Sequence, residues 1–442
     1  MKSKTLQRLL KKQFDDQKKS RQKELLAARM SAHAGASSQQ HNWINELKLN
    51  DKTGAILPIL KNLILFLCNH PDWKSVLGFN EFSAQVVVRK RPYWDDVEPD
   101  AVWTDHFETL TRAWFQEQDI PANQGDVGRA IQAAARKNSF HPLRTLLDGL
   151  QPQWDGQRRI DQCLTTYLHT PDTPYARAIG PRFLISAVAR IYDPGCKADH
   201  MLVLEGSQGQ GKSKAVRALA VRDEWYTDRL SNPNTKDAAI ETAGAWLIEI
   251  AEMHALLAAT TSTTKTYITR QSERYRPPYG KHLIKHERQS IFIGTINPPG
   301  TGYLKDPTGS RRIWPVECQG TIDIEGLIRD RNQLWAEAVV RYKAGDVWWL
   351  ETPELEALAT AEQDARVEID VWQEPIEQWL GDREETSVSE ILEHVFGIAD
   401  PLQKSQRMQN RVAKILTRLQ FTRTRLRNKA KKGGREWRYW RN

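Results

Sequence analysis

Along the middle of the chain, short continuous apolar runs take turns with stretches that favour helices. Four short apolar runs have the character of buried strands and are separated by helix-forming stretches; these runs are residues 201–204, 245–253, 290–297 and 312–317. Strands that are apolar on both faces are typical of a parallel sheet covered by helices. The pattern therefore predicts an α/β core, and the polar residues at the carboxyl ends of these strands are candidates for ligand binding.

Apolar positions at helical spacing dominate the region before this core. Residues 55–68 and 105–118 predict helices of a small, mainly helical domain, and an alternating segment at 85–89 predicts a strand within it. Residues 177–192 predict an amphipathic helix that leads into the first core strand.

The region after the core predicts helices followed by a hairpin. Residues 371–397 predict two short helices joined near Thr386 and Ser387, and residues 408–421 predict a third. A basic segment then turns at residues 433–434, and alternation over residues 436–440 indicates a strand. Helices followed by a basic two-stranded wing resemble a winged-helix domain, whose third helix and wing would contact DNA phosphates.

These patterns divide the chain into four expected parts. Residues 1–40 form a basic arm, expected to be a frayed helix followed by a run of small residues typical of a flexible linker, and residues 41–160 form the mainly helical domain. Residues 161–345 form the α/β core, and residues 346–442 form the basic C-terminal domain.

Positive charge is concentrated at the two ends of the chain. The net charge is +9, yet residues 1–30 carry ten Lys and Arg against three acids, and residues 403–442 carry fourteen against one. The centre is therefore acidic. This asymmetry predicts two ends that contact a polyanion, although a basic segment can also be a solvated surface without a ligand.

The four cysteines lie far apart and form neither a C-x-x-C pair nor a cluster with His at metal-ligand spacing. Neither a disulfide framework nor a zinc site is predicted, which is typical of the reducing cytoplasm. The basic N-terminal region lacks the apolar stretch of a secretory signal, and the longest apolar run, residues 55–68, is too short to cross a bilayer. We expect a cytoplasmic protein without a membrane partner.

A glycine-rich segment follows the first core strand and satisfies the pattern G-x-x-x-x-G-K-[ST] in a strand–turn–helix context. In this motif backbone N–H groups surround phosphate oxygens, the Lys reaches the β- and γ-phosphates, and the hydroxyl ligates Mg²⁺. The sequence therefore predicts a site for ATP and Mg²⁺. Its expected binding residues are Gly206, Ser207, Gln208, Gly209, Gln210, Gly211, Lys212, Ser213 and Lys214.

Two glutamates and an asparagine on the later strands are candidate catalytic groups. Glu249 and Glu252 lie in an apolar run, where a buried carboxylate needs a cation or a donor to compensate it. Glu252 falls at the end of that strand and is the preferred Mg²⁺ ligand, partly through water, and the preferred acid for polarising the attacking water; Glu249 is the second choice. Asn297 ends the next strand, where its amide can hold that water.

Basic side chains precede the last two strands. Arg311 and Arg312 open the last apolar run, where a guanidinium can neutralise charge on a transferring phosphoryl group, often from a neighbouring subunit. Residues 268–289 are rich in Arg, Lys and His around turn formers such as Pro277 and Gly280. They predict a hairpin whose cationic tip contacts a DNA backbone. Its candidate DNA-binding residues are Arg276, Lys281, His282 and Lys285.

Four segments in this order resemble the virulence-associated protein E family, ATPases of phages, satellites and bacterial genomic islands that are similar to superfamily 3 replicative helicases. The segments are GSQGQGKS, WLIEIAEM, RYRPPYGK and FIGTINPPGTGYLKDPTGSRRIWPVE. The resemblance extends from about residue 138 to about residue 318. It implies an AAA+-like ATPase that forms a ring, commonly a hexamer, and acts on DNA.

The resemblance implies matching roles for individual residues: nucleotide and Mg²⁺ binding for Lys212 and Ser213, the acidic motif for Glu252, the sensor asparagine for Asn297, the arginine finger for Arg311 or Arg312, and the DNA-contacting hairpin for Lys281 with His282. Many relatives carry a primase domain upstream, but the corresponding part of this chain has no His/Asp or Asp-x-Asp cluster that predicts a priming site. Many helicases have two adjacent acids where this chain has Glu-x-x-Glu, so the choice between the two glutamates stays open.

Together these features predict an ATP- and Mg²⁺-dependent DNA helicase that replicates a phage, satellite or genomic island in a bacterial host. It would form an oligomeric ring, hydrolyse ATP at subunit interfaces and act on single-stranded or forked DNA, with a primase or initiator as a candidate partner. The alternative is an ATP-switched DNA-binding initiator or regulator without processive unwinding. A nucleotide kinase is disfavoured, because no acceptor-nucleoside lid is evident and both ends are basic.

Overall fold

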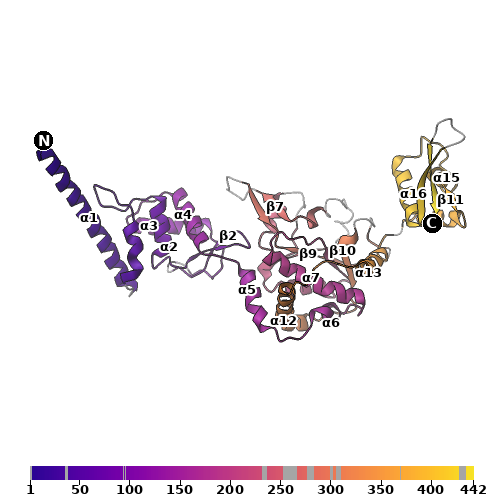
Figure 1. Cartoon of the computed structure of the whole chain (residues 1–442), viewed down its shortest axis with the longest axis horizontal. Coiled ribbons are helices and arrows are strands. Elements are labelled where there is room, and N and C mark those ends of the chain that lie inside the picture. The colour runs from indigo at the N-terminus through magenta and orange to yellow at the C-terminus, as the bar shows by residue number, and fades with distance from the viewer. Residues whose placement is uncertain are drawn as a thin grey trace.

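The computed structural model of the protein describes residues 2–34, 38–92, 94, 96–230, 236–251, 266–275, 283–298, 302–304, 310–368, 370–427 and 435–442. In Figure 1 these residues form an N-terminal body that begins with a long helix, a central body and a C-terminal body. None of the helices in these ranges is long and apolar enough to cross a membrane.

The central body is organised around a five-stranded, all-parallel sheet in the order β10-β4-β9-β6-β5. Alternate residues of β4 belong to two different cores: Leu202 and Leu204 to one, and Met201 and Val203 to the other. Because the strands are buried on both faces, they appear in the sequence as continuous apolar runs, and the predicted α/β core is confirmed. The strands are β4 (Met201–Glu205), β5 (Tyr226–Thr227), β6 (Leu247–Ile250), β9 (Ile291–Ile296) and β10 (Ile313–Glu317).

Helices cover one face of this sheet with a single large core (Figure 1). The helix predicted over residues 177–192 is present as α7, but it is not amphipathic: it is buried on nearly all sides, because α5, α6, α12 and the sheet surround it. The helices of this body are α5 (Pro142–Leu150), α6 (Cys163–Leu168), α7 (Pro174–Tyr192), α8 (Lys212–Leu219), α9 (Lys236–Glu241), α12 (Ile324–Lys343) and α13 (Pro353–Asp364). Short 3-10 turns are η2 (Gln151–Gln153), η3 (Ile160–Gln162), η4 (Asp223–Trp225) and η5 (Ser310–Arg312).

Both expected limits of the central body need correction. Leu143 and Leu147 of α5 are fully buried in the large core, so this body begins near residue 141 and not at residue 161. At the other end, Gln363 of α13 donates from Nε2 to the Ile313 carbonyl of β10 at 2.9 Å. The central body therefore continues past residue 345, because α13 completes its packing.

The N-terminal body combines helices with a small sheet in the order β2-β1-β3. The helix expected in the basic arm is present as one continuous helix, α1, and its Leu26 and Ala27 contact the core of this body. Lys23 of α1 also donates to the Asn45 carbonyl at 2.7 Å. The other elements are η1 (Ser38–Glu46), α2 (Leu60–Asn69), β1 (Leu77–Asn80), β2 (Gln85–Val88), α3 (Asp105–Glu117), α4 (Gln124–Lys137) and β3 (Ser139–Phe140), and α1 spans Lys2–Ala34.

The C-terminal body contains three helices and a sheet in the order β11-β13-β12. Ser387 and Glu390 form a reciprocal capping box, in which each side chain accepts a backbone N–H of the other residue, so the expected helix start near Ser387 is confirmed. The predicted hairpin strands are present, whereas the expected turn at residues 433–434 lies outside the described residues. The elements are α14 (Gln373–Leu380), β11 (Glu385–Thr386), α15 (Val388–His394), α16 (Gln406–Arg418), β12 (Phe421–Arg427) and β13 (Arg435–Arg441).

Candidate nucleotide-binding site

The glycine-rich segment connects β4 to α8 at the carboxyl edge of the sheet. Gly211 directly precedes α8 with φ 97°, a conformation that side chains rarely tolerate. Gly206 has φ 152°, a backbone conformation that also disfavours a side chain. Ser207, Gln208 and Gly209 are exposed at the tip of the loop, and Lys214 is exposed on α8. The loop and the N-terminus of α8 thus converge in an arrangement that binds anions.

Lys212 lies at the centre of this loop. Its Nζ donates to the carbonyl oxygens of Gly206 at 2.6 Å and Ser207 at 2.8 Å, and to Asn297 Oδ1 at 3.0 Å. The residue is 8% exposed, and burial lowers the pKa of its ammonium group. No carboxylate of the described residues forms an ion pair with it. A buried cation held only by neutral oxygens favours the binding of an anion.

Three hydroxyl groups donate hydrogen bonds to the carboxylate of Glu249. Ser213 Oγ donates to its Oε1 at 2.6 Å, Thr295 Oγ1 donates to the same oxygen at 2.7 Å, and Tyr226 OH donates to Oε2 at 2.6 Å. Glu249 is 1% exposed, and these donors compensate its buried charge. Ser213 itself stays exposed to solvent, so a ligand can reach this cluster from the loop side.

The structure therefore brings Lys212, Ser213, Glu249 and Asn297 together at one edge of the sheet. Glu252, the preferred acid in the sequence, lies outside the described residues. Sequence reasoning missed Thr295 and Tyr226. Thr295 could have been found, because it is a polar residue near the end of the apolar run that leads to Asn297, and Asn297 directly follows β9. The two-residue strand that carries Tyr226 gives no such signal.

These residues fit a magnesium–nucleotide complex. Mg²⁺ prefers oxygen ligands and usually keeps several waters, with one or two protein side chains and the phosphates completing its shell. Ser213 and Glu249 offer such oxygens beside the Lys212 ammonium group. Among the described residues no group of three or more His, Cys, Asp or Glu could hold a metal without a nucleotide.

Arg311 and Arg312 lie away from this cluster. Ile313, which follows them, pairs with Met201 at the start of β4, whereas the phosphate loop follows Glu205, which pairs with Glu317. At about 3.3 Å per residue, the strands separate these two edges by about 13 Å. Arg311 is exposed, and Arg312 is half-buried with an Nε that has no hydrogen-bond partner among the described residues. Both arginines thus stand at the amino edge of the sheet.

The predicted hairpin before β9 is present. Strand β7 (Ser272–Tyr275) pairs antiparallel with β8 (Ile284–Glu287), and β9 begins shortly after β8. Lys285 is exposed on β8 and forms an ion pair with Glu287 at 2.5 Å, which partly neutralises it. Three other candidate residues for DNA binding, Arg276, Lys281 and His282, lie outside the described residues.

A buried ion pair supports the end of β4, directly before the phosphate loop. Arg366 Nε lies 2.7 Å from both carboxylate oxygens of Glu205, whose side chain is 5% exposed. Arg366 also accepts backbone N–H groups of Tyr303 and Leu304 at its carbonyl, at 2.9 and 3.0 Å. This pair therefore joins three segments that are distant in the sequence.

Removing one partner of this pair should be costly. Arg366→Ala leaves the Glu205 carboxylate buried without its cation, and we expect the free energy of unfolding to fall by about 3–5 kcal/mol. Arg217→Ala breaks the exposed pair with Asp223 and should leave the free energy of unfolding nearly unchanged, because solvent screens that pair. Denaturant unfolding of both variants measures the two values. Equal losses would contradict the support that we assign to Arg366.

If this site hydrolyses ATP, the Tyr226 hydroxyl should affect the rate of hydrolysis without affecting the binding of ATP. Burial raises the pKa of Tyr226 and the Glu249 carboxylate adds to this shift, so the phenol stays protonated and donates. Tyr226→Phe should lower kcat about tenfold and leave KM for ATP within about threefold, since one hydrogen bond that orients a carboxylate is lost.

The control is Tyr192→Phe, which removes a similar bond of 2.7 Å from a tyrosine to Asp148, far along the chain from the cluster. Tyr192→Phe should change neither kcat nor KM for ATP by more than about twofold. A rise in KM without a change in kcat for Tyr226→Phe would show that this hydroxyl serves binding and not orientation.

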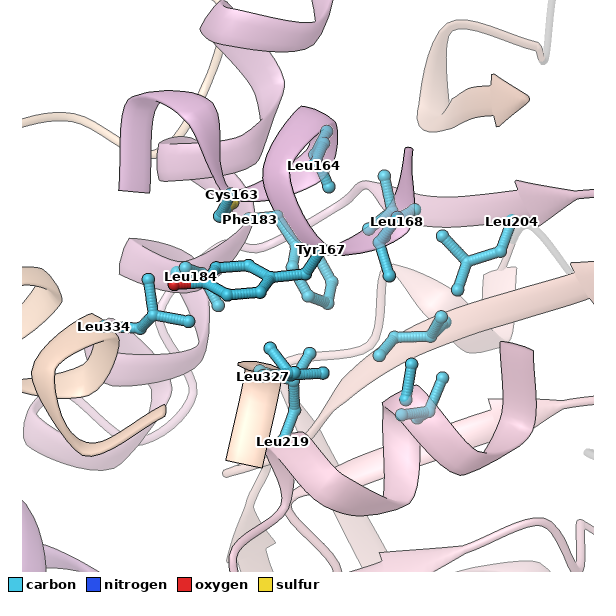
Figure 2. Close-up of a pocket in the computed structure, with 14 residues that line it drawn as sticks. Cys163, Leu164, Tyr167, Leu168, Phe183, Leu184, Leu204, Leu219, Leu327 and Leu334 are labelled. Atoms are coloured by element: carbon cyan, nitrogen blue, oxygen red, sulfur yellow. The ribbon is translucent and has the colours of Figure 1, made fainter. Parts of the chain in front are cut away.

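An apolar cavity of about 30 Å³ lies beneath α8 (Figure 2). Leu204 of β4, Leu219 of α8 and Leu327 of α12 line it, together with Tyr167 of α6, whose hydroxyl leaves the cavity to donate to Asp330. A space of this size holds about one water molecule and offers it no polar partners. The cavity is therefore separate from the phosphate site and is a packing gap of the large core.

Two solved structures of the NrS-1 C-terminal region are similar to the chain. The apo structure of region 305–718 is 12% identical, with a TM-score of 0.43, and the match covers 83% of this chain and 96% of that chain. The A form apo structure is also 12% identical, with a TM-score of 0.44, and covers 87% and 100%. These values are too low to transfer residue roles. No curated protein matches the chain in sequence.

The family described as the virulence-associated protein E-like domain matches residues 147–368, just over half of the chain. The match begins in α5 and ends just after α13 and Arg366, so it covers the five-stranded sheet, the phosphate loop, the hairpin and both arginines. The chain therefore belongs to the virulence-associated protein E-like family.

Proposed function

We propose that this protein is an ATP- and Mg²⁺-dependent DNA helicase of the superfamily 3 type, which replicates a phage, satellite or genomic island. The observation that carries the proposal is Lys212, a buried ammonium group held by neutral oxygens within a loop that satisfies the phosphate-binding pattern. Beside it, Ser213 and the buried Glu249 supply oxygens of the kind that Mg²⁺ prefers.

Each residue of the candidate site would have its own role in ATP hydrolysis. Lys212 and the backbone of the loop would bind the β- and γ-phosphates, and Ser213 would ligate Mg²⁺, which neutralises charge on the transferring phosphoryl group. Glu249 would orient and polarise the attacking water while Tyr226 and Thr295 hold its carboxylate in place. Asn297 contacts Lys212 and would hold the water on the other side.

Hydrolysis would take place at the interfaces of a ring, commonly hexameric in the proteins that the sequence resembles. The strand order β10-β4-β9-β6-β5 supports an AAA+-like core. The position of Arg311 and Arg312 at the amino edge, opposite the phosphate loop, supports action on the nucleotide of a neighbouring subunit. Arg311 is the better candidate, because it is exposed while Arg312 is half-buried.

DNA would be contacted by two parts of the chain. The hairpin β7–β8 precedes the strand that carries Asn297 at its end, so a movement of the hairpin can follow the state of the nucleotide. The three helices and the basic hairpin of the C-terminal body support a winged-helix domain that anchors the ring on DNA.

The alternative is an ATP-switched DNA-binding initiator or regulator that hydrolyses ATP without processive unwinding. The same phosphate loop and basic C-terminal body serve this function equally well. The two functions differ in strand displacement, which only the helicase performs.

Two measurements test the proposal. ATP hydrolysis should rise when single-stranded or forked DNA is added, and the protein should displace a strand from a forked duplex in the presence of ATP and Mg²⁺. Lys212→Ala should abolish both activities. ATP hydrolysis that rises with DNA but is not accompanied by strand displacement would favour the initiator. ATP hydrolysis that does not change when DNA is added would contradict the helicase.

A further inference from the structure

One face of the hairpin β12–β13 changes from buried to exposed along its length. Phe421 and Tyr439 are 3% and 2% exposed and pack in the C-terminal core with Val412 and Leu416 of α16. Trp437 stands two residues before Tyr439 on the same strand, so it shares this face, yet it is 43% exposed. Trp437 therefore lies on the α16 side of the hairpin, beyond the edge of the core.

Two arginines of the neighbouring strand flank this indole. The guanidinium carbon of Arg423 lies 3.8 Å from the centre of the Trp437 ring, and that of Arg425, which pairs with Trp437 across the hairpin, lies 5.5 Å away. Neither arginine has a carboxylate partner among the described residues. The stack fixes the orientation of the indole and keeps two positive charges beside it.

A second tryptophan on this strand, Trp440, has different surroundings. Trp440 is 38% exposed but points to the other face of β13, where it pairs with Thr422 and Glu385 in the ladder. On that face Arg438 forms ion pairs with Glu385 at 2.7 Å and Glu390 at 2.6 Å. The arginine beside Trp440 is thus engaged with carboxylates of the same body, whereas Arg423 and Arg425 beside Trp437 have no such partners among the described residues.

We propose, on the basis of the proposed function, that Trp437 with Arg423 and Arg425 forms a stacking platform for an unpaired DNA base at the border of a duplex. The flat face of a base is covered by its neighbours inside a duplex and becomes accessible where the strands separate. An indole stacks on such a base without regard to its identity, and the arginines contact the adjoining phosphates. The fourteen basic residues against one acid in residues 403–442 match this polyanionic partner.

The duplex side of the same border would lie along α16. Its exposed side chains Gln406, Arg407, Asn410 and Lys414 form one polar face, while its apolar face packs on the hairpin. The C-terminal body would therefore place the ring at a fork and not only on double-stranded DNA.

The test compares three DNAs of one sequence with the full-length protein: a blunt duplex, a forked duplex and a forked duplex with 2-aminopurine at the first unpaired position. Trp437→Ala should weaken binding of the fork roughly ten- to hundredfold, the range of one lost base stack, and binding of the blunt duplex less than about twofold. Trp437→Phe should retain fork binding within about threefold. The wild-type protein should quench the 2-aminopurine fluorescence.

Trp440→Ala is the matched control and should bind all three DNAs like the wild-type protein. Equal losses on fork and blunt duplex for Trp437→Ala, or an unquenched probe with the wild-type protein, would overturn the platform. If the wild-type protein binds none of the DNAs, the proposed function fails as well. The fluorescence measurement uses the unaltered protein. It therefore tests stacking on the unpaired base even if Trp437→Ala disturbs the fold.

Discussion

Glu249→Gln is expected to lower ATP hydrolysis about a hundredfold or more while ATP binding stays within about threefold. The amide keeps the shape of the side chain but loses the negative charge that polarises water. It also gives Ser213, Thr295 and Tyr226 a poorer acceptor than the carboxylate that they now share. Steady-state hydrolysis and the affinity for a fluorescent ATP analogue measure the two quantities separately.

Glu252→Gln is the matched comparison, because it makes the same chemical change three residues later in the run 245–253. If Glu249 is the principal acid, Glu252→Gln should keep hydrolysis within about tenfold of the wild-type rate. A larger loss for Glu252→Gln than for Glu249→Gln would return the role to the acid that the sequence favours. The contacts of Glu249 with the Ser213 hydroxyl are the reason that we expect the opposite order.

The parallel sheet and the phosphate loop could be predicted because their signals are local. Buried strands appear as apolar runs, and the loop requires glycine where φ is positive, as at Gly211. The choice between Glu249 and Glu252 could not be made, since both stand in one apolar run and only the packing of α8 decides which carboxylate meets Ser213. Tyr226 reaches the cluster from a strand too short to leave a pattern.

The limits of the central body could not be predicted from local sequence patterns either. Helix α5 has the apolar spacing of any amphipathic helix, and nothing in its sequence states that Leu143 and Leu147 pack with α12 and not with the helices before it. Gln363 of α13 and Arg366, which follows this helix, contact Ile313 and Glu205 of the central sheet, so positions far apart in the sequence are joined. Non-local contacts of this kind decide where a body ends.

The double variant Arg311→Ala/Arg312→Ala should lose hydrolysis about a thousandfold, the range of a missing arginine finger, while it retains ATP binding. The reason is geometric. Both arginines stand at the amino edge of β10, and the phosphate loop follows β4 at the opposite edge, so we expect them to serve the nucleotide of a neighbouring subunit and not the one in their own. Lys212→Ala should be equally inactive for a different reason, since it removes the cation that binds the phosphates.

Mixing these two inactive proteins separates action across an interface from action within one subunit. In a mixed ring some interfaces combine the intact Lys212 of one subunit with the intact arginines of its neighbour. For random mixing in equal amounts this applies to about a quarter of the interfaces, and hydrolysis should return to about that fraction of the wild-type rate. If the mixture stays inactive although mass measurements show mixed rings, the arginines act within their own subunit or only support the fold. In that case, the separation of the two edges of the sheet would have to be closed by a movement of β10.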